Sequence, residues 1–235
     1  MNVLLQAVAP ETSTFTFSPI VILAGLVAAL VAYLLGSICF AIPVGYLFTK
    51  KDIRTMGSGN AGMTNVLRNC GFAAAALTLI GDVGKAVAAV VLGQLLFEGI
   101  SGANGLYGGY IAGLFVMLGH TYPLYHKFKG GKGVLTAVGM LLTLDPTSCL
   151  LGLIVFVTVF VLTRIISISS ICAAAALPVI VGVLWSSRSN PDWIYATVMV
   201  SIIALFIIFN HRSNISRLLA GTEKKLTIGG KKKSQ

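Results

Sequence analysis

The chain of 235 residues is 56% hydrophobic and only 10% charged, with a formal net charge of +10. A soluble domain is not this apolar, so we expect an all-α polytopic membrane protein with most of the chain in a bilayer. The basic residues lie between and after the apolar runs. They therefore indicate membrane lipids and phosphorylated substrates as partners, and no nucleic acid. The four isolated cysteines predict neither a disulfide framework nor a metal site, and nothing in the sequence calls for a cofactor.

The apolar runs predict about seven transmembrane helices. Residues 1–18 contain no Lys or Arg and are expected to form an extracytoplasmic extension. The first run, Pro19–Phe48, is too long for a signal peptide and is expected to be a retained helix, kinked or unwound towards its C-terminal end. The remaining runs cover about 72–97, 105–120, 134–144, 147–163, 168–185 and 193–209. The run 134–144 is short for a span and predicts a tilted or broken crossing.

The run 72–97 contains two ionisable residues, Asp82 and Lys85, one helical turn apart. Charged groups at membrane depth are costly and face a partner or a cavity. The pair either supports a functional site or fixes helix packing by neutralising itself. The spacing favours the second interpretation, because opposite charges three residues apart satisfy each other.

The segment Gly57–Arg68, with the sequence GSGNAGMTNVLR, alternates glycines with short polar side chains. Such a segment can place backbone N–H groups and the start of a helix around an anion. Thr64, Asn65 and Arg68 would share one face of that helix, and the planar guanidinium of Arg68 suits a phosphate. The alternative is a flexible polar loop between two membrane helices.

The segment Gly119–Gly133, with the sequence GHTYPLYHKFKGGKG, places three lysines beside a second glycine cluster. Glycines next to cations again predict a phosphate cradle, although the spacing is not that of a Walker loop. As an alternative, Lys127, Lys129 and Lys132 could be simple cytoplasmic anchors.

The third polar segment, His211–Glu223, follows the last apolar run and has the sequence HRSNISRLLAGTE. His211 and Asn214 are one turn apart and can face the same cavity, although His211 could also be an interfacial residue. Residues 224–235 read as a basic cytoplasmic tail.

Charge distribution predicts the orientation. Seven spans with the N-terminus outside and the C-terminus in the cytoplasm would leave only Arg188 outside and Lys85 within a helix, so 15 of the 17 Lys and Arg residues would be cytoplasmic. The three polar segments would then lie on the same face of the membrane.

These three segments resemble, in order, the three motifs of the bacterial membrane acyl-phosphate:glycerol-3-phosphate acyltransferase family. The resemblance covers about residues 33–223 and departs at Ala86, where the family tends to have glycine after the lysine. It implies a single integral membrane acyltransferase domain, 19–223, in the bacterial inner membrane, with its active site facing the cytoplasm. It also implies acyl transfer from acyl phosphate to the 1-hydroxyl of glycerol 3-phosphate, giving 1-acylglycerol 3-phosphate and phosphate. The enzyme that makes acyl phosphate is a possible further partner.

The residue patterns and the resemblance together predict three groups of site residues. The catalytic group is Ser58, Arg68, His211 and Asn214; the substrate-binding group is Gly57, Gly59, Asn60, Gly62, Thr64, Asn65, His120, Lys129, Gly130, Gly131, Lys132 and Gly133; the structural support is Asp82, Lys85 and Glu223. An acyl-serine at Ser58 with His211 as its base is chemically possible. We favour direct transfer, in which Ser58 hydrogen-bonds the donor and the hydroxyl proton leaves to His211 or to the donor's own phosphate.

Two other classes of function fit parts of the pattern. A transporter of a phosphorylated solute would also have cationic loops and short helices, but it should show related halves of inverted topology, and no internal repeat is visible. A non-catalytic lipid-binding scaffold would not need Ser58, His211 and Asn214 beside the basic groups. No His of the chain has an Asp five positions later, and no G-x-S-x-G segment occurs, which argues against thioester-type and serine-hydrolase chemistry.

Overall fold

The computed structural model describes residues 18–226, so all but the last residue of the predicted N-terminal extension (1–18) and most of the predicted basic tail (224–235) lie outside the described residues. Within the described range the chain is helical and contains no strand. The α-helices are α1 (Pro19–Gly36), α2 (Ala41–Thr49), α3 (Met63–Cys70), α4 (Phe72–Ser101), α5 (Gly105–Thr121), α6 (Val134–Leu144), α7 (Pro146–Thr163), α8 (Ile166–Ser187), α9 (Trp193–Asn210) and α10 (Arg212–Leu219), with the 3-10 helices η1 (Ile53–Thr55) and η2 (Leu124–His126).

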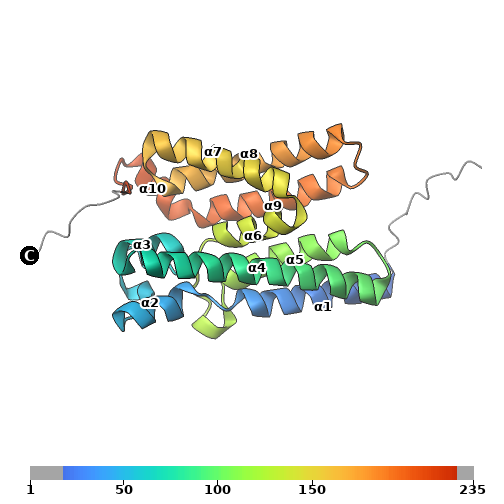
Figure 1. The fold of residues 1–235 in the computed structure, drawn as a ribbon, viewed down its shortest axis with the longest axis horizontal. Coiled ribbons are helices and arrows are strands. Elements are labelled where there is room, and N and C mark those ends of the chain that lie inside the picture. Colours follow the sequence, from blue (N-terminus) through green and yellow to red (C-terminus); the bar gives the residue numbers. More distant parts are fainter. Residues whose placement is uncertain (1–17, 227–235) are drawn as a thin grey trace, which may run out of the picture.

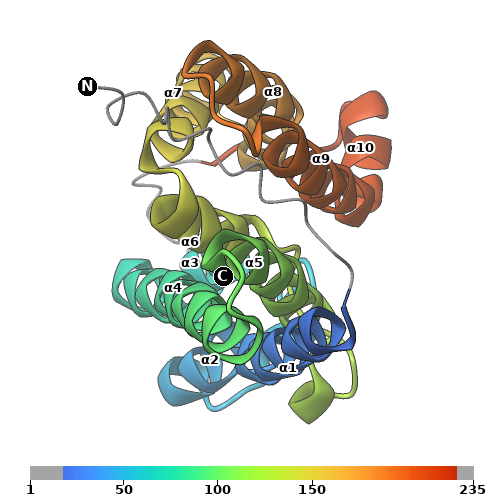
Figure 2. The same ribbon diagram turned by 90° about the vertical axis from the view of Figure 1, so that its right-hand side faces the viewer.

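The long helices form two groups. Helices α1, α4 and α5 pack against one another, α8 packs against both α7 and α9, and α6 lies between the groups with contacts to α4, α5 and α7 (Figure 1). The view along the helices in Figure 2 shows the same division. The largest buried apolar cluster lies where α5 and α6 meet α8 and α9, and includes Tyr110, Met140, Val181 and Val200.

Five segments are long and apolar enough to cross a membrane: Pro19–Thr49, α4, α7, α8 and α9. Large apolar side chains on these segments are exposed, as at Leu26 and Leu205, which are 63% and 67% exposed. A bilayer is the environment in which such surfaces are stable. The all-helical membrane class is therefore confirmed. The total of seven spans and their orientation stay predictions, with α6 a short apolar helix of 11 residues.

The predicted interruption of the first span lies between α1 and α2. The helix ends at Gly36, and the chain turns through Ser37–Phe40 before α2 begins. Ser37 donates from N and from Oγ to the Tyr33 carbonyl, each at 2.9 Å. Pro43 plays no part in the break, because it lies in the first turn of α2, where proline is tolerated.

Small residues let α5 lie against its neighbours. A methyl group at Gly119 would overlap the backbone of α1 at the Tyr33 carbonyl, and one at Gly113 would overlap Met140 of α6. Close backbone approach at glycines is a common means of packing membrane helices. The last turn of α5, which carries His120, is thereby held against α1 and α6.

Polar contacts also hold the helices together, and one of them joins the two groups where α5 and α9 begin (Figure 1). Tyr107 donates its hydroxyl to Asp192 at 2.7 Å. Trp185 donates from Nε1 to Asp145 at 2.7 Å, and the same carboxylate caps α7 by accepting from Ser148 N. A buried carboxylate requires such donors. A cavity lies at the other end of the molecule, beside α3 and α10.

Candidate active site

The three polar segments line one cavity of about 870 Å³ at the end of the molecule where α3 and α10 lie (Figure 1). Of the predicted site residues, the cavity is lined by Gly57, Ser58, Gly59, Asn60, Gly62, Thr64, Asn65, Arg68, Asp82, His120, Lys129, Gly130, Gly131, Lys132, Gly133, His211, Asn214 and Glu223. Lys85 lies behind this wall. The cavity also has apolar lining, including Leu135 and Phe156, so it offers a polar region beside a surface that suits an acyl chain.

Four helices begin at the cavity. Its lining includes Met63 of α3, Val134 of α6, Ile166 of α8 and Arg212 of α10, each the first residue of its helix. The first N–H groups of a helix lack intrahelical partners and form its positive end. Four such ends around one space, together with Arg68 and the lysines, give the cavity a lining whose charge suits an anion.

In the first segment, Asn65 holds the loop together. Its side chain is 2% exposed, accepts from Ser58 N, and donates to the carbonyls of Ile53, Met56 and Asn60. The N–H groups of Gly59 and Gly62 bond within the loop as well. We expected this loop to offer its backbone N–H groups to an anion. At Ser58, Gly59 and Gly62 these groups are already used, and the Ser58 side chain stays exposed.

Arg68 lies on α3 one turn after Thr64, and both line the cavity, as the helical spacing predicts. Its side chain reaches the last described part of the chain, with Nη2 donating to the Lys224 carbonyl at 3.1 Å. Nearby, Leu226 N donates to the Arg164 carbonyl at 2.7 Å. Glu223 and Lys224 therefore border the cavity, which the distance in sequence between Arg68 and Lys224 does not suggest.

The second segment uses its glycines for packing. Gly130 N donates to the Thr121 carbonyl and Gly131 N to the His120 carbonyl, so neither is free to bind phosphate. A methyl group at Gly131 would overlap the His120 ring. Gly133 has φ +87°, a left-handed conformation that favours glycine, and it leads directly into α6. The N–H groups for the expected phosphate cradle would therefore come from the start of α6. Gly130 and Gly131 instead hold this helix start against the end of α5.

A hydrogen-bonded network joins the second and third segments. Lys132 donates to Oδ1 of Asn214, and Asn214 donates from Nδ2 to Glu223 at 2.6 Å. Glu223 also accepts from Ser167 at 2.8 Å and from Arg217 at 2.6 Å. Burial lowers the pKa of Lys132 to about 8, with Arg217 and Arg68 acting in the same direction and Glu223 opposing. Hydrogen bonds from its three partners hold the pKa of Glu223 below its usual value despite its burial.

Our sequence-based site lacked Ser167 and Arg217, the two further partners of Glu223. Arg217 lies within the third motif, three residues after Asn214, so helical spacing could have indicated it. Ser167 begins a cluster of serines in an otherwise apolar span, a weak signal for a polar contact.

His211 is buried, with 3% of its surface exposed, at the end of α9. Its Nδ1 lies 2.8 Å from the Ile207 carbonyl, an acceptor, so the ring proton belongs on Nδ1 and Nε2 carries a lone pair. Burial lowers the pKa of His211 to about 4, and the charge of Lys132 adds to this effect. At neutral pH His211 is an uncharged hydrogen-bond acceptor in the cavity wall.

The predicted ion pair within α4 is present, with Lys85 Nζ 2.8 Å from Asp82 Oδ1. A third buried group joins it, because His120 Nδ1 lies 3.0 Å from Lys85 Nζ. The pair therefore does more than neutralise itself, since it also contacts a residue of the second motif.

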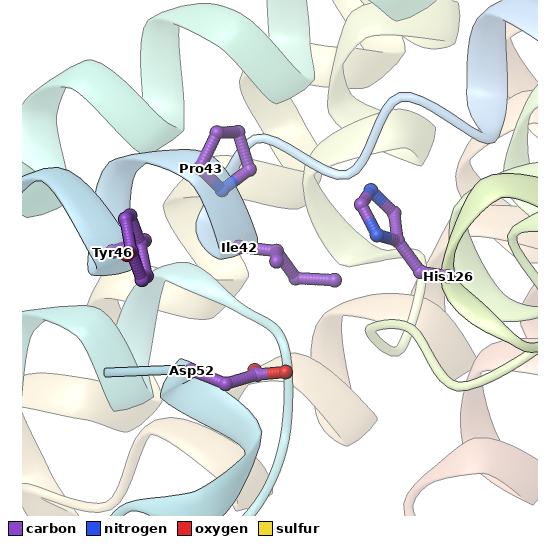
Figure 3. A pocket seen from close by; sticks show the side chains of 5 residues that line it. All are labelled: Ile42, Pro43, Tyr46, Asp52 and His126. Atoms are coloured by element: carbon purple, nitrogen blue, oxygen red, sulfur yellow. The ribbon is translucent and has the colours of Figure 1, made fainter. Parts of the chain in front are cut away.

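A second, shallower pocket of about 460 Å³ lies outside the main cavity and is lined by Ile42, Pro43, Tyr46, Asp52 and His126 (Figure 3). Asp52 at its edge pairs with Arg54 at 2.6 Å, which lowers the pKa of that carboxyl. Arg54 also donates to the His126 carbonyl at 2.7 Å and so connects the chain before the first motif to η2. No predicted site residue lies in this pocket.

The chain is similar to known proteins along most of its length. A family model described as glycerol-3-phosphate acyltransferase matches residues 26–221. A glycerol-3-phosphate acyltransferase of Thermoanaerobacter sp. (strain X514) is 44% identical over 202 residues, covering 84% of this chain and 93% of its own length. One of Clostridioides difficile (strain 630) is 40% identical over 211 residues, covering 88% and 97%.

Two crystal structures have a similar fold. They are of PlsY, an integral membrane glycerol 3-phosphate acyltransferase, in its glycerol 3-phosphate form and its lysophosphatidic acid form. Each is 32% identical and covers 87% of this chain and 96% of its own, with TM-scores of 0.74 and 0.72. The residues matched by the family model include the first two polar segments and the third as far as Gly221. The chain therefore belongs to the glycerol-3-phosphate acyltransferase family of integral membrane proteins.

Proposed function

We propose that this protein transfers a fatty acyl group from acyl phosphate to the 1-hydroxyl of glycerol 3-phosphate, an early step of phospholipid synthesis. The products are 1-acylglycerol 3-phosphate and phosphate. The observation that carries the proposal is the convergence of four helix N-termini, Arg68 and Lys132 on one cavity that also has an apolar wall. Both substrates carry a phosphate, and the donor carries an acyl chain, so this lining fits the pair.

The donor is a mixed anhydride and is already activated, so the protein has mainly to position the substrates and stabilise charge. The hydroxyl oxygen of glycerol 3-phosphate attacks the acyl carbon, and the bond between that carbon and the phosphate oxygen breaks. The hydroxyl proton leaves to an oxygen of the donor's phosphate, which departs as inorganic phosphate. Arg68 and Lys132 offset the charge that collects on the departing phosphate.

His211 orients the acceptor hydroxyl. Its Nε2 lone pair can accept the hydroxyl hydrogen bond, since Nδ1–H is held by the Ile207 carbonyl. With its pKa at about 4, protonated His211 is a stronger acid than a phosphate monoester, whose second pKa is about 6. The donor's phosphate is therefore the better final acceptor of the proton.

Asn214 and Ser58 bind the substrates in this proposal. Lys132 and Asn214 are joined by a hydrogen bond, so the two motifs act on the same substrate group. Ser58 Oγ has no imidazole partner among residues 18–226, whereas an acyl-serine mechanism needs a base beside the nucleophile. Ser58 is proposed to hydrogen-bond the donor.

The proposal includes the setting of the reaction. The domain 19–223 lies in the bacterial inner membrane with its cavity facing the cytoplasm, where glycerol 3-phosphate is soluble and the enzyme that makes acyl phosphate can supply the donor. The excess of Lys and Arg in and after the three motifs supports this orientation.

The test uses the purified protein in lipid nanodiscs with palmitoyl phosphate and glycerol 3-phosphate, and with palmitoyl-CoA as the comparison donor. We expect lysophosphatidic acid and phosphate to form in equal amounts from palmitoyl phosphate, and no product from palmitoyl-CoA. Turnover with palmitoyl-CoA alone would overturn the donor assignment. An acylated Ser58 trapped by mass spectrometry, with donor present and acceptor absent, would overturn direct transfer.

A further inference from the structure

Lys85, Asp82 and His120 form a buried cluster behind the cavity, at the place where α4, α5 and the break between α1 and α2 meet. The side chains are 4%, 1% and 4% exposed. Lys85 Nζ hydrogen-bonds the Ile38 carbonyl at 2.7 Å and contacts His120 Nδ1 at 3.0 Å. It also lies 2.8 Å from Asp82 Oδ1, an ion contact that lacks the alignment of a hydrogen bond.

The contact between Lys85 and His120 determines where the imidazole carries its proton. An ammonium group has N–H donors and no lone pair, so a nitrogen hydrogen-bonded to it has to be an acceptor. Nδ1 of His120 therefore carries the lone pair, and its proton lies on Nε2. We propose that Lys85 is a positioning residue, which fixes His120 as the neutral Nε2–H tautomer and so makes it a hydrogen-bond donor to a substrate phosphate.

Charge balance supports a neutral ring, and the contact with Lys85 then selects the tautomer. Lys85 and Asp82 neutralise each other, so a neutral His120 leaves the cluster without net charge in the interior of a membrane protein. A protonated His120 would add an unbalanced positive charge next to the ammonium, which is costly in such surroundings. The distances agree, because Nδ1 lies 3.0 Å from Lys85 Nζ and 3.5 Å from Asp82 Oδ1.

The other ring nitrogen of His120 lies where a donor is useful. Nε2 has no hydrogen-bond partner among the described residues, and it is next to the Cα of Gly131, where an added methyl would overlap it. His120 lines the cavity beside the start of α6. A phosphate oxygen at that helix end is the acceptor that this N–H suits.

The two cavity histidines then have opposite roles. His211 donates from Nδ1 to a carbonyl and presents a lone pair at Nε2, whereas His120 accepts at Nδ1 and presents a proton at Nε2. The first arrangement suits a hydroxyl hydrogen and the second suits a phosphate oxygen. This assignment deepens the function proposed above, but the tautomer itself can be tested without any substrate.

The direct test is nitrogen NMR of the full-length protein labelled with ¹⁵N-histidine and reconstituted in lipid. The chain has only three histidines, so the His120 signals are assigned by their loss in His120→Gln. We expect His120 to be neutral with its proton on Nε2. A doubly protonated ring, or a neutral ring with its proton on Nδ1, would overturn the proposal. Failure of the acyltransferase assay would leave this measurement intact.

The second arm removes Lys85 without leaving a buried carboxylate unpaired. In Asp82→Asn/Lys85→Met we expect the His120 proton to distribute over both nitrogens and the KM for glycerol 3-phosphate to rise about tenfold, as for the loss of one hydrogen bond to a charged group. His120→Gln, whose amide can donate from a similar position, should retain more affinity than His120→Leu. An unchanged tautomer in the double variant would overturn the role of Lys85.

A purely structural role for Lys85 makes a different prediction, because Lys85 also holds the Ile38 carbonyl. In that case the double change would cost as much affinity in a His120→Leu background as in wild type. If Lys85 acts through His120, the further loss in that background should be small. Gly84→Ala, a neighbour with open space around its Cα, is the matched control and should leave both the spectrum and KM unchanged.

Discussion

Asn214 donates from Nδ2 to Oε1 of Glu223 at 2.6 Å, and this contact determines which way the Asn214 amide faces. With Nδ2 turned to the carboxylate, Oδ1 is turned to Lys132. The carboxylate of Glu223 therefore controls the partner of Lys132, although the two side chains are joined only through Asn214.

The first prediction concerns this orientation. Glu223→Ala removes the acceptor for Asn214, Ser167 and Arg217, and should lower kcat/KM by about 10- to 100-fold, the effect of losing hydrogen bonds to a charged group. Glu223→Gln keeps an acceptor oxygen and should retain more activity. Glu98→Ala on α4, exposed and outside the cavity, is the control. Normal kinetics in Glu223→Ala would show that Asn214 does not need the carboxylate.

The second prediction tests the guanidinium of Arg68. Arg68→Lys keeps the charge but loses the planar pair of donors that matches a phosphate, so kcat/KM should fall at least tenfold. Arg188→Lys makes the same change at the far end of α8 and should have no effect. Kinetics near wild type in Arg68→Lys would contradict a phosphate-binding role of the first motif and favour a simple connecting loop.

The third prediction concerns pH. Lys132 has a pKa of about 8, so it is charged below that value and loses its charge as the pH rises through it. The kcat/KM for glycerol 3-phosphate should therefore fall above about pH 8. Lys132→Arg should abolish this alkaline decline, since arginine stays charged, whatever its absolute rate. A decline at the same pH in Lys132→Arg would assign it to another group.

The fourth prediction separates two roles of His211. His211→Gln can accept the hydroxyl hydrogen bond but cannot act as a base, so it should retain clearly more activity than His211→Ala. The pH dependence of kcat/KM in His211→Gln should match that of wild type between pH 5 and 7. The pKa of His211 is about 4, so this side chain does not titrate in that range. Equal and complete inactivity of both variants would favour a true general base.

The fifth prediction concerns Gly131. Gly131→Ala places a methyl group against the His120 ring and the Ala61 carbonyl, so the melting temperature should fall by several degrees, as expected for overpacking by about 1–3 kcal/mol. The KM for glycerol 3-phosphate should rise in the same variant, since the ring would have to move. Gly84→Ala, with open space, serves as the control for both measurements. An unchanged melting temperature would mean that the loop adapts without strain.

Contacts within one helix could be predicted from the sequence, whereas contacts between helices could not. The spacing of Asp82 and Lys85 indicates their ion pair, because residues three apart on a helix are neighbours. Nothing in the spacing links Lys85 to His120, 35 residues later, because that contact depends on how α4 and α5 pack. The same holds for Ser167 and Glu223, which are 56 residues apart.

The glycine segments show a second limit of prediction. Their composition correctly indicates loops next to helix N-termini, and the anion site there stays a prediction. It does not show that the N–H groups of Gly130 and Gly131 bond to the last turn of α5. Backbone hydrogen bonds depend on tertiary geometry, and the same glycines could have left these groups open. The predicted preference for phosphate depends less on these N–H groups. The basic side chains and helix N-termini supply positive charge whether the glycine N–H groups are open or bonded.

The path of the chain after α10 has a practical consequence for handling the protein. Lys224 is bound to Arg68 and Leu226 to Arg164, so the described part of the chain ends within two residues of the cavity lining. Pro19, where α1 begins, lies at the opposite end of the molecule (Figure 1). A fluorescent reporter joined directly to Leu226 would therefore start beside the substrates and compete with them for space, whereas one joined directly before Pro19 would start at the end far from them.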